Sequence, residues 1–161
     1  MQNISELILA IIFTLMPVTE LRVGLPLAVD FAQTNNLPII PIFLLIVLIN
    51  ILLIVLIFLF LDFLHESFLK IKFYKKGFNY FLLRIRKKAD KIENNKVYYQ
   101  KFIVLALFVA VPLPGTGAWT GCLIAWLLDL ERKRSIISIS IGVIIAGLII
   151  LLASLGFFAL F

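Results

Sequence analysis

The hydrophobic positions of this chain fall into runs of two different lengths. Two runs are long: residues 38–61 are almost entirely Leu, Ile, Val and Phe, interrupted by Asn50, and residues 135–161 have a similar composition. Each run exceeds the roughly 20 residues that an α-helix needs to cross about 30 Å of hydrocarbon. The pattern therefore predicts two membrane-spanning helices, at 38–62 and 135–161.

Four further hydrophobic runs are too short for a straight crossing. They cover residues 4–16, 25–32, 102–111 and 122–128. Apolar runs of about 10–14 residues are more often re-entrant or interfacial than spanning. Because the short runs come in two pairs, we expect two helical hairpins that enter the membrane and return to the same side. The hairpins are predicted at 4–36 and 102–130.

Each pair of short runs flanks a segment rich in proline and glycine. The first tip segment, residues 17–26, reads Pro-Val-Thr-Glu-Leu-Arg-Val-Gly-Leu-Pro, and the second tip segment, residues 112–121, reads Pro-Leu-Pro-Gly-Thr-Gly-Ala-Trp-Thr-Gly. Proline removes a backbone donor, and glycine permits turns that other residues resist. A helix that enters either segment should break there, so each segment is expected to form the tip of a hairpin.

The order of these segments predicts one membrane domain, 1–161, that is all-α and built from two repeats. Repeat one, 1–64, and repeat two, 102–161, each contain a re-entrant hairpin followed by a transmembrane helix. The linker 65–101 joins them. Because an odd number of crossings separates the hairpins, the second repeat is expected to be inverted relative to the first.

Composition and charge agree with this interpretation and add an orientation. The chain is 63% hydrophobic and 15% charged, against about 45–50% and 25% in soluble domains. The linker 65–101 holds eleven Lys and Arg residues and three acidic ones. Lys and Arg collect in cytoplasmic loops, so the linker is expected inside and both termini outside. Aromatic residues among its cations suit anionic lipid headgroups better than nucleic acid, for which no recognition module is visible.

The first tip segment contains two ionisable residues between apolar arms, Glu20 and Arg22. Ionisable groups at membrane depth are costly and persist when they are paired, face a cavity or have a function. The two residues could neutralise each other and fix the tip. Alternatively, Arg22 would bind an anion such as a phosphate and Glu20 would exchange a proton. Thr19 would donate a hydrogen bond beside them, and Pro17 begins the tip.

The second tip segment carries no charge but many free backbone groups. The N-terminus of its second arm would point N–H groups towards the membrane midplane, where they favour anions. The candidate residues here are Pro112, Pro114, Gly115, Thr116, Gly117 and Trp119. The spacing of Gly117 and Gly121 suits close helix packing equally well, so the sequence leaves both interpretations open.

Other polar residues give weaker signals. Asn50 is expected to face the bundle interior, either in a bond between helices or as a substrate ligand. Asp62, His65 and Glu66 could mimic a metal cluster, but their place at a helix exit favours simple hydration. The chain offers no set of nucleophile, base and orienting group, so we expect no enzyme, no metal and no cofactor.

The two tip segments, in this order and over nearly the whole chain, resemble the small multidrug export protein family of prokaryotes. More distantly, they resemble the DedA (SNARE-associated, VTT-domain) superfamily. The resemblance implies opposed re-entrant hairpins in a prokaryotic plasma membrane. It also implies that Glu20 and Arg22 match the acidic and Arg positions near DedA tips. Thr116 stands where DedA proteins tend to carry an acidic residue after the Pro-Gly step.

These observations predict a proton-coupled secondary transporter. It would export a small or amphipathic substrate by alternating access between the two hairpin tips. A translocase of lipid-linked phosphates or phospholipids, opening sideways to the bilayer, is the first alternative. A non-transporting membrane scaffold is the second. The small transmembrane mass suggests a homodimer, and the lipid bilayer is the other expected partner.

Overall fold

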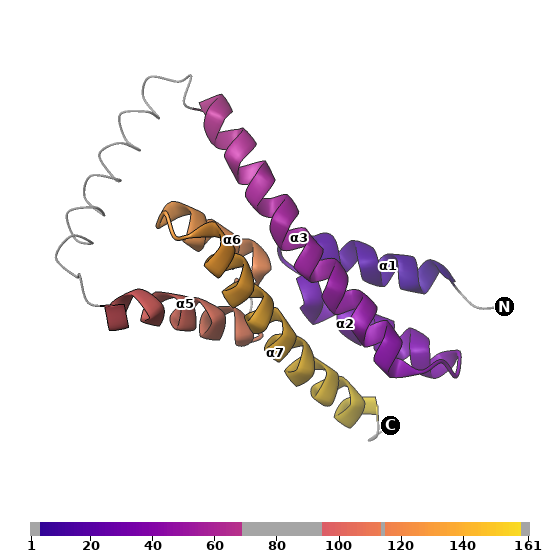
Figure 1. Ribbon diagram of the computed structural model, residues 1–161. Helices are drawn as coiled ribbons and strands as arrows, with labels where there is room; N and C mark the ends of the chain where they lie inside the picture. Colours follow the sequence, from indigo (N-terminus) through magenta and orange to yellow (C-terminus); the bar gives the residue numbers. More distant parts are fainter. Residues whose placement is uncertain (1–3, 69–94, 114, 159–161) are drawn as a thin grey trace.

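The computed structural model describes residues 4–68, 95–113 and 115–158, and the side chains of 4–63, 99–113 and 115–156. All regular structure in this part of the chain is helical (Figure 1), which confirms the predicted all-α class. The helices are α1 (Ile4–Leu15), α2 (Glu20–Thr34), α3 (Ile39–Phe68), α5 (Asn95–Ala110), α6 (Ala118–Leu127) and α7 (Arg132–Phe158). Residues 69–94, which contain most of the predicted basic linker, lie outside the described residues.

The two long helices are α3 and α7. Within them, Ile39–Phe63 and Arg132–Gly156 are long and apolar enough to cross a membrane, which agrees with the predicted spanning segments. Both helices extend towards the linker side beyond the predicted bounds, because α3 continues to Phe68 and α7 already begins at Arg132. They pack against each other, and Figure 1 shows that they run in opposite directions.

Each predicted hairpin segment consists of two short helices and a turn. α1 and α2 form the first hairpin, and α5 and α6 form the second. The longest of these helices, α5, has 16 residues, so it spans only about 24 Å at 1.5 Å per residue. In Figure 1 the two hairpins open towards opposite ends of the α3–α7 pair, and their tips lie together beside the middle of both long helices.

The helix breaks are narrower than the sequence predicts. The first turn covers only residues 16–19, so the rest of the first tip segment is helical. The second turn covers 111–117, and α6 begins at Ala118. Gly24 lies within α2 and does not break it. A Cβ at this position would lie 2.0 Å from Thr14 Oγ1 and 2.7 Å from the Ala10 carbonyl oxygen. Its glycine permits α1 and α2 to pack closely.

Both hairpins end in the same backbone geometry. Asn36 and Asp129 follow α2 and α6 with φ of 54° and 52°. The next N–H group donates back to the carbonyl five residues earlier, from Leu37 to Ala32 at 2.8 Å and from Leu130 to Ala125 at 3.0 Å. This is the Schellman termination of a helix. The two halves therefore share a local signature that their sequences do not reveal.

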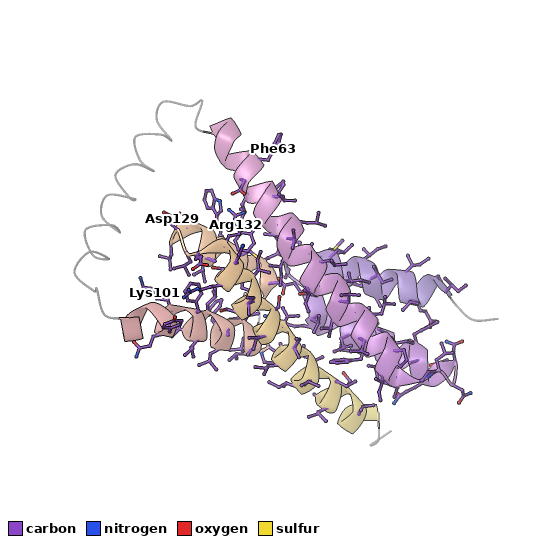
Figure 2. All side chains as sticks on the ribbon, in the orientation of Figure 1. Phe63, Lys101, Asp129 and Arg132 are labelled. Atoms are coloured by element: carbon purple, nitrogen blue, oxygen red, sulfur yellow. The ribbon has the colours of Figure 1, made fainter. Side chains whose placement is uncertain are left out.

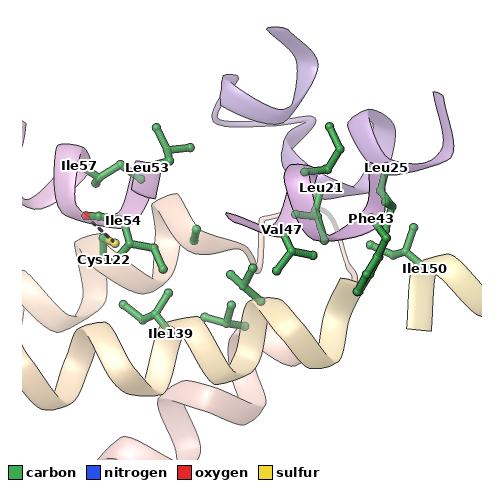
Figure 3. Close-up of a cluster of buried hydrophobic side chains, with 14 of the residues drawn as sticks. Leu21, Leu25, Phe43, Val47, Leu53, Ile54, Ile57, Cys122, Ile139 and Ile150 are labelled. Carbon is green, nitrogen blue, oxygen red and sulfur yellow. Dashed lines mark hydrogen bonds between the residues drawn. The ribbon is translucent and has the colours of Figure 1, made fainter. Parts of the chain in front are cut away.

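The core lies between the tips and the two long helices (Figure 3). Buried apolar side chains of α2, α3, α6 and α7 form one cluster, which includes Leu21, Leu25, Val47, Ile54, Ile57, Cys122, Ile139 and Ile150. The outer face of α3 is also apolar, and Leu44, Leu48, Leu52 and Leu59 are each more than half exposed. A stripe of leucines without polar partners favours hydrocarbon over water as the surrounding medium.

Candidate functional site

Glu20 joins the two hairpins at their tips. It is the first residue of α2 and only 4% exposed. Its Oε2 accepts the N–H of Ala118 at 3.0 Å, and its Oε1 accepts the N–H of Trp119 at 3.1 Å. These are the first two N–H groups of α6. The cap residue of this helix is Gly117, which has no side chain to accept a hydrogen bond from them. A carboxylate at this place satisfies donors that the helix leaves open and complements its positive end.

The approach of Glu20 to α6 depends on a glycine. A Cβ at Gly117 would lie 1.6 Å from Glu20 Oε2, so any side chain there would displace the carboxylate. The structure thus shows a close approach of Gly117 to a charged group of the other hairpin. Glu20 itself has φ 42°, a left-handed conformation that is strained for a residue other than glycine and is typical of functional positions.

Arg22 reaches the second hairpin independently of Glu20. Its Nη2 donates to Thr116 Oγ1 at 3.0 Å, and the Thr116 hydroxyl donates to the Val111 carbonyl at 2.5 Å. Within the described residues, no carboxylate lies within the 4.0 Å of Arg22 that would define an ion pair. The Glu20 carboxylate is directed to the start of α6 instead. The self-neutralising pair, one of the two alternatives that the sequence left open, does not form as a direct contact, and each residue binds the opposite hairpin.

Two other candidate donors are engaged with backbone carbonyls at the end of α1. The Trp119 indole Nε1 donates to the Leu15 carbonyl at 3.3 Å, which is a further contact between the hairpins. The Thr19 hydroxyl donates to the Phe13 carbonyl at 2.6 Å. Both side chains therefore hold the first tip in place.

Asn50 lies in the middle of α3 and is 1% exposed. Neither its Nδ2 nor its Oδ1 has a hydrogen-bond partner among the described residues. The amide lines a cavity of about 20 Å³ together with Glu20, Arg22, Thr116 and Gly117. A cavity of this size has room for one water molecule. The structure thus brings Asn50 to the same site as the two charged residues.

The remaining candidates lie in the two turns. Pro112 lines the same cavity, whereas Pro17 is exposed in the turn after α1. Gly115 has φ 89°, which only glycine adopts readily. Pro114 lies outside the described residues.

One polar cluster was missed by the sequence interpretation. Asp62 on α3 forms two hydrogen bonds with Arg132 on α7, at 2.7 and 2.9 Å, and accepts the indole N–H of Trp126 on α6 at 3.1 Å. The Arg132 guanidinium also lies 4.7 Å from the centre of the Phe58 ring. Asp62 is therefore a structural ion-pair partner and not merely hydrated. The signal was available, since opposite charges stand at the linker-side ends of the two spanning helices.

No group of three or more metal-ligating side chains occurs in the described part of the chain. What the fold does contain is two spanning-length helices with apolar outer faces and two short hairpins that meet through buried polar contacts. These features define an integral membrane protein whose candidate site lies inside the helical bundle.

The comparison with known families gives the same answer. The family model described as "Putative small multi-drug export protein" matches residues 20–149, which include Glu20 and Arg22, the second tip and most of both long helices. The chain belongs to this family, whose description places it among membrane transport proteins. No curated protein and no solved structure matches the chain.

Proposed function

We propose that this protein is a proton-coupled secondary transporter that exports a small or amphipathic substrate through a site between its hairpin tips. The observation that carries the proposal is the contact of Glu20 with the N-terminus of α6. It places a titratable acid at the junction of two interrupted helical units. Many secondary transporters bind substrate and coupling ion at such discontinuous helices near the bilayer midplane.

The proposed topology is an inverted repeat of two re-entrant hairpins. Three features support it: short hairpin helices, antiparallel α3 and α7, and hairpins that open towards opposite ends (Figure 1). Figure 2 shows Phe63, Lys101, Asp129 and Arg132 at one end of the molecule, away from the N-terminus of α1 and the C-terminus of α7. Because positive charge is retained inside, that end and the linker 65–101 are cytoplasmic in this proposal, and both termini are outside.

Cysteine labelling tests this topology. Cys122 is fully buried, so single cysteines can be added to the native sequence with little background labelling. We expect Lys101→Cys and Glu131→Cys to react with an impermeant maleimide only from the cytoplasmic side, and Ser5→Cys only from outside. Labelling of positions 101 and 131 from different sides would exclude two re-entrant hairpins.

Alternating access would proceed by separating one hairpin tip from the other. Protonation of Glu20 removes the negative charge that the N-terminus of α6 attracts, so it weakens the contact between the tips. Arg22 would then bind the anionic part of the substrate. A homodimer would enclose the pathway that one small bundle leaves open. The proposal contains no bond-breaking step, so the protein is not an enzyme.

Transport in proteoliposomes tests the coupling role. The proteoliposomes are loaded with a panel of cationic, neutral and anionic fluorescent amphiphiles. The flux of each amphiphile is followed with and without an imposed proton gradient. We expect the gradient to accelerate flux in the native protein and not in Glu20→Gln. Asp30→Asn, an exposed acid at the other end of α2, is the matched control and keeps the acceleration. Normal gradient-driven flux from Glu20→Gln would remove Glu20 from the coupling mechanism.

A translocase of lipid-linked phosphates is the second candidate. A mainly apolar groove of about 520 Å³ is lined by Arg22 and Pro26 of α2 and by Ile149 and Ala153 of α7. An acyl chain fits such walls, and Arg22 would hold the phosphate. Leaflet exchange of labelled lipid phosphates separates the candidates, because solute flux without lipid movement rejects the translocase.

A non-transporting scaffold makes the opposite prediction about the linker. Deleting residues 69–94 would abolish its function, whereas substitutions of Glu20 and Arg22 would leave it intact. The buried contacts of these two residues favour the transporter.

A further inference from the structure

The cavity between the tips contains more hydrogen-bond donors than anions to receive them. The Ala118 N–H, the Arg22 guanidinium (which also donates to Thr116) and the Asn50 amide line it, and the Trp119 N–H makes a fourth donor that reaches the Glu20 carboxylate there. One carboxylate, that of Glu20, satisfies two of them. The Asn50 amide is buried without a partner, although other buried polar side chains such as Thr14 and Ser154 bond to a carbonyl four residues earlier. Burying an amide without partners is unfavourable, so Asn50 favours a polar occupant of the cavity.

The charge state of Glu20 determines whether the site can bind an anion or a cation. With Glu20 ionised, its carboxylate already occupies the N-terminus of α6, so a second anion would be repelled. With Glu20 protonated, the positive helix end, the guanidinium and the amide N–H groups remain without an anion. A cationic ligand meets the reverse situation, because Arg22 and the helix end oppose it in both states.

We infer that this site takes a small anionic group, a carboxylate, phosphate or sulfonate, in the place of the Glu20 carboxylate, and that this anion and a proton on Glu20 bind together. The inference deepens the proposed function and rests on its site. Its consequence is specific: proton and substrate would cross in the same direction and not in exchange for each other, so an outward gradient of the substrate, and not an inward proton gradient, would drive export. The existing cavity holds only a water, so the anion requires the space that the Glu20 carboxylate leaves.

The organic remainder of the ligand has a place to lie. The groove of about 520 Å³ along α2 and α7 shares Arg22 and Pro112 with the cavity. A ligand with its charged group at Arg22 can therefore extend an apolar portion between these helices.

The groups around Glu20 make it the acid whose protonation can be linked to the binding of an anion. On its own helix Arg22 faces the cavity, and α6 contributes the buried thiol of Cys122 nearby. α3 presents Asn50, and α7 presents Val143 and Ala146. Among the described residues that line the cavity, Glu20 is thus the one carboxylic acid.

Sulfate is a suitable probe because it keeps its charge across the working pH range. Its binding to the full-length protein in nanodiscs is measured by calorimetry between about pH 5 and 8, in two buffers of different ionisation enthalpy. Above the pH at which Glu20 ionises, we expect about one proton to be taken up for each sulfate bound. The affinity should fall about tenfold for each pH unit above the pH at which Glu20 ionises, because linked binding is reciprocal.

Three variants sharpen the measurement. Glu20→Gln, neutral at every pH, should bind sulfate at least tenfold more tightly than the native protein at the upper end of this range, without proton uptake. Asn50→Leu, which keeps the side-chain size, should weaken binding at least fivefold. Asp30→Asn should match the native protein in affinity and in proton uptake.

The outcomes separate this inference from the proposed function. Sulfate binding without proton uptake, weaker binding in Glu20→Gln, or no binding at any pH would overturn the inference even if gradient-driven transport depends on Glu20. Proton-linked sulfate binding in a protein that shows no gradient-driven flux would support the inference and overturn the transporter. The native protein alone gives the decisive proton count, so the test does not depend on a variant that folds.

Discussion

The two hairpins contribute different chemistry to the same contact. The first supplies charged side chains, Glu20 and Arg22, from the first turn of α2. The second supplies backbone N–H groups at the start of α6 and the hydroxyl of Thr116. The Glu20 carboxylate finds its donors on α6, and the first N–H groups of α6 find their acceptor on Glu20, so each hairpin completes the other. The contact is therefore specific to the assembled bundle, and it connects residues nearly a hundred positions apart.

The hairpins differ most at their tips and least at their open ends. Both end in a Schellman motif, whereas the first turn covers residues 16–19 and the longer second turn covers 111–117. A shared framework thus carries two unlike tips. Three substitutions test how much of the fold depends on this division of roles.

The largest effect is expected from removing the acid. Glu20→Leu leaves the N–H groups of Ala118 and Trp119 buried without an acceptor, which costs about 1–3 kcal/mol for each group. We expect the free energy of unfolding in detergent to fall by roughly 2–5 kcal/mol, with a smaller loss for Glu20→Gln, which keeps an acceptor oxygen. Asp30→Leu is the control. Equal stability of Glu20→Leu and Asp30→Leu would contradict the capping role.

A smaller effect is expected from the glycine that receives the acid. Gly117→Ala places a methyl group where the Glu20 carboxylate lies, and such overpacking costs about 1–3 kcal/mol. The control is Gly156→Ala near the end of α7, where no atom lies within 4 Å of the added Cβ. Alanine favours the helix there, so its unfolding temperature should stay the same or rise slightly. A Gly117→Ala protein as stable as this control would show that the tips separate without cost.

The smallest effect is expected at the linker-side end. The side chains of Arg132 and Asp62 are 44% and 43% exposed, and ion pairs of this kind contribute about 0.2–1 kcal/mol. Asp62→Asn should lower the unfolding temperature slightly, and the difference should shrink at high salt. Lys133→Gln, at a neighbouring exposed position, should change little. A loss as large as that of Glu20→Leu would move the main polar link from the tips to this cluster.

The sequence predicts the helices well and the contacts between them poorly. Run length and the two proline-rich segments place α3, α7 and both turns, because these signals are local. The capping of α6 by Glu20 depends on how the halves pack, and nothing within either segment encodes it. The alternative of a direct Glu20–Arg22 pair does not hold, because Glu20 binds the start of α6 and Arg22 binds Thr116.

The interaction of Asp62 shows the same limit. Its partners, Arg132 and Trp126, lie more than sixty residues away, and the position beside the linker made hydration the simpler prediction. Asn50 is the converse case. Its place in an apolar run marked it as unusual, but only packing reveals that the amide has no partner.

The hydrogen bond from Trp119 to the Leu15 carbonyl places an intrinsic fluorophore at the contact between the two hairpins. The chain has two tryptophans, so Trp126→Phe leaves Trp119 as the sole emitter. Its indole spans the junction of the hairpins, and its emission should shift to longer wavelength when the tips part and water enters. Conformational cycling could then be followed in real time without attaching a dye.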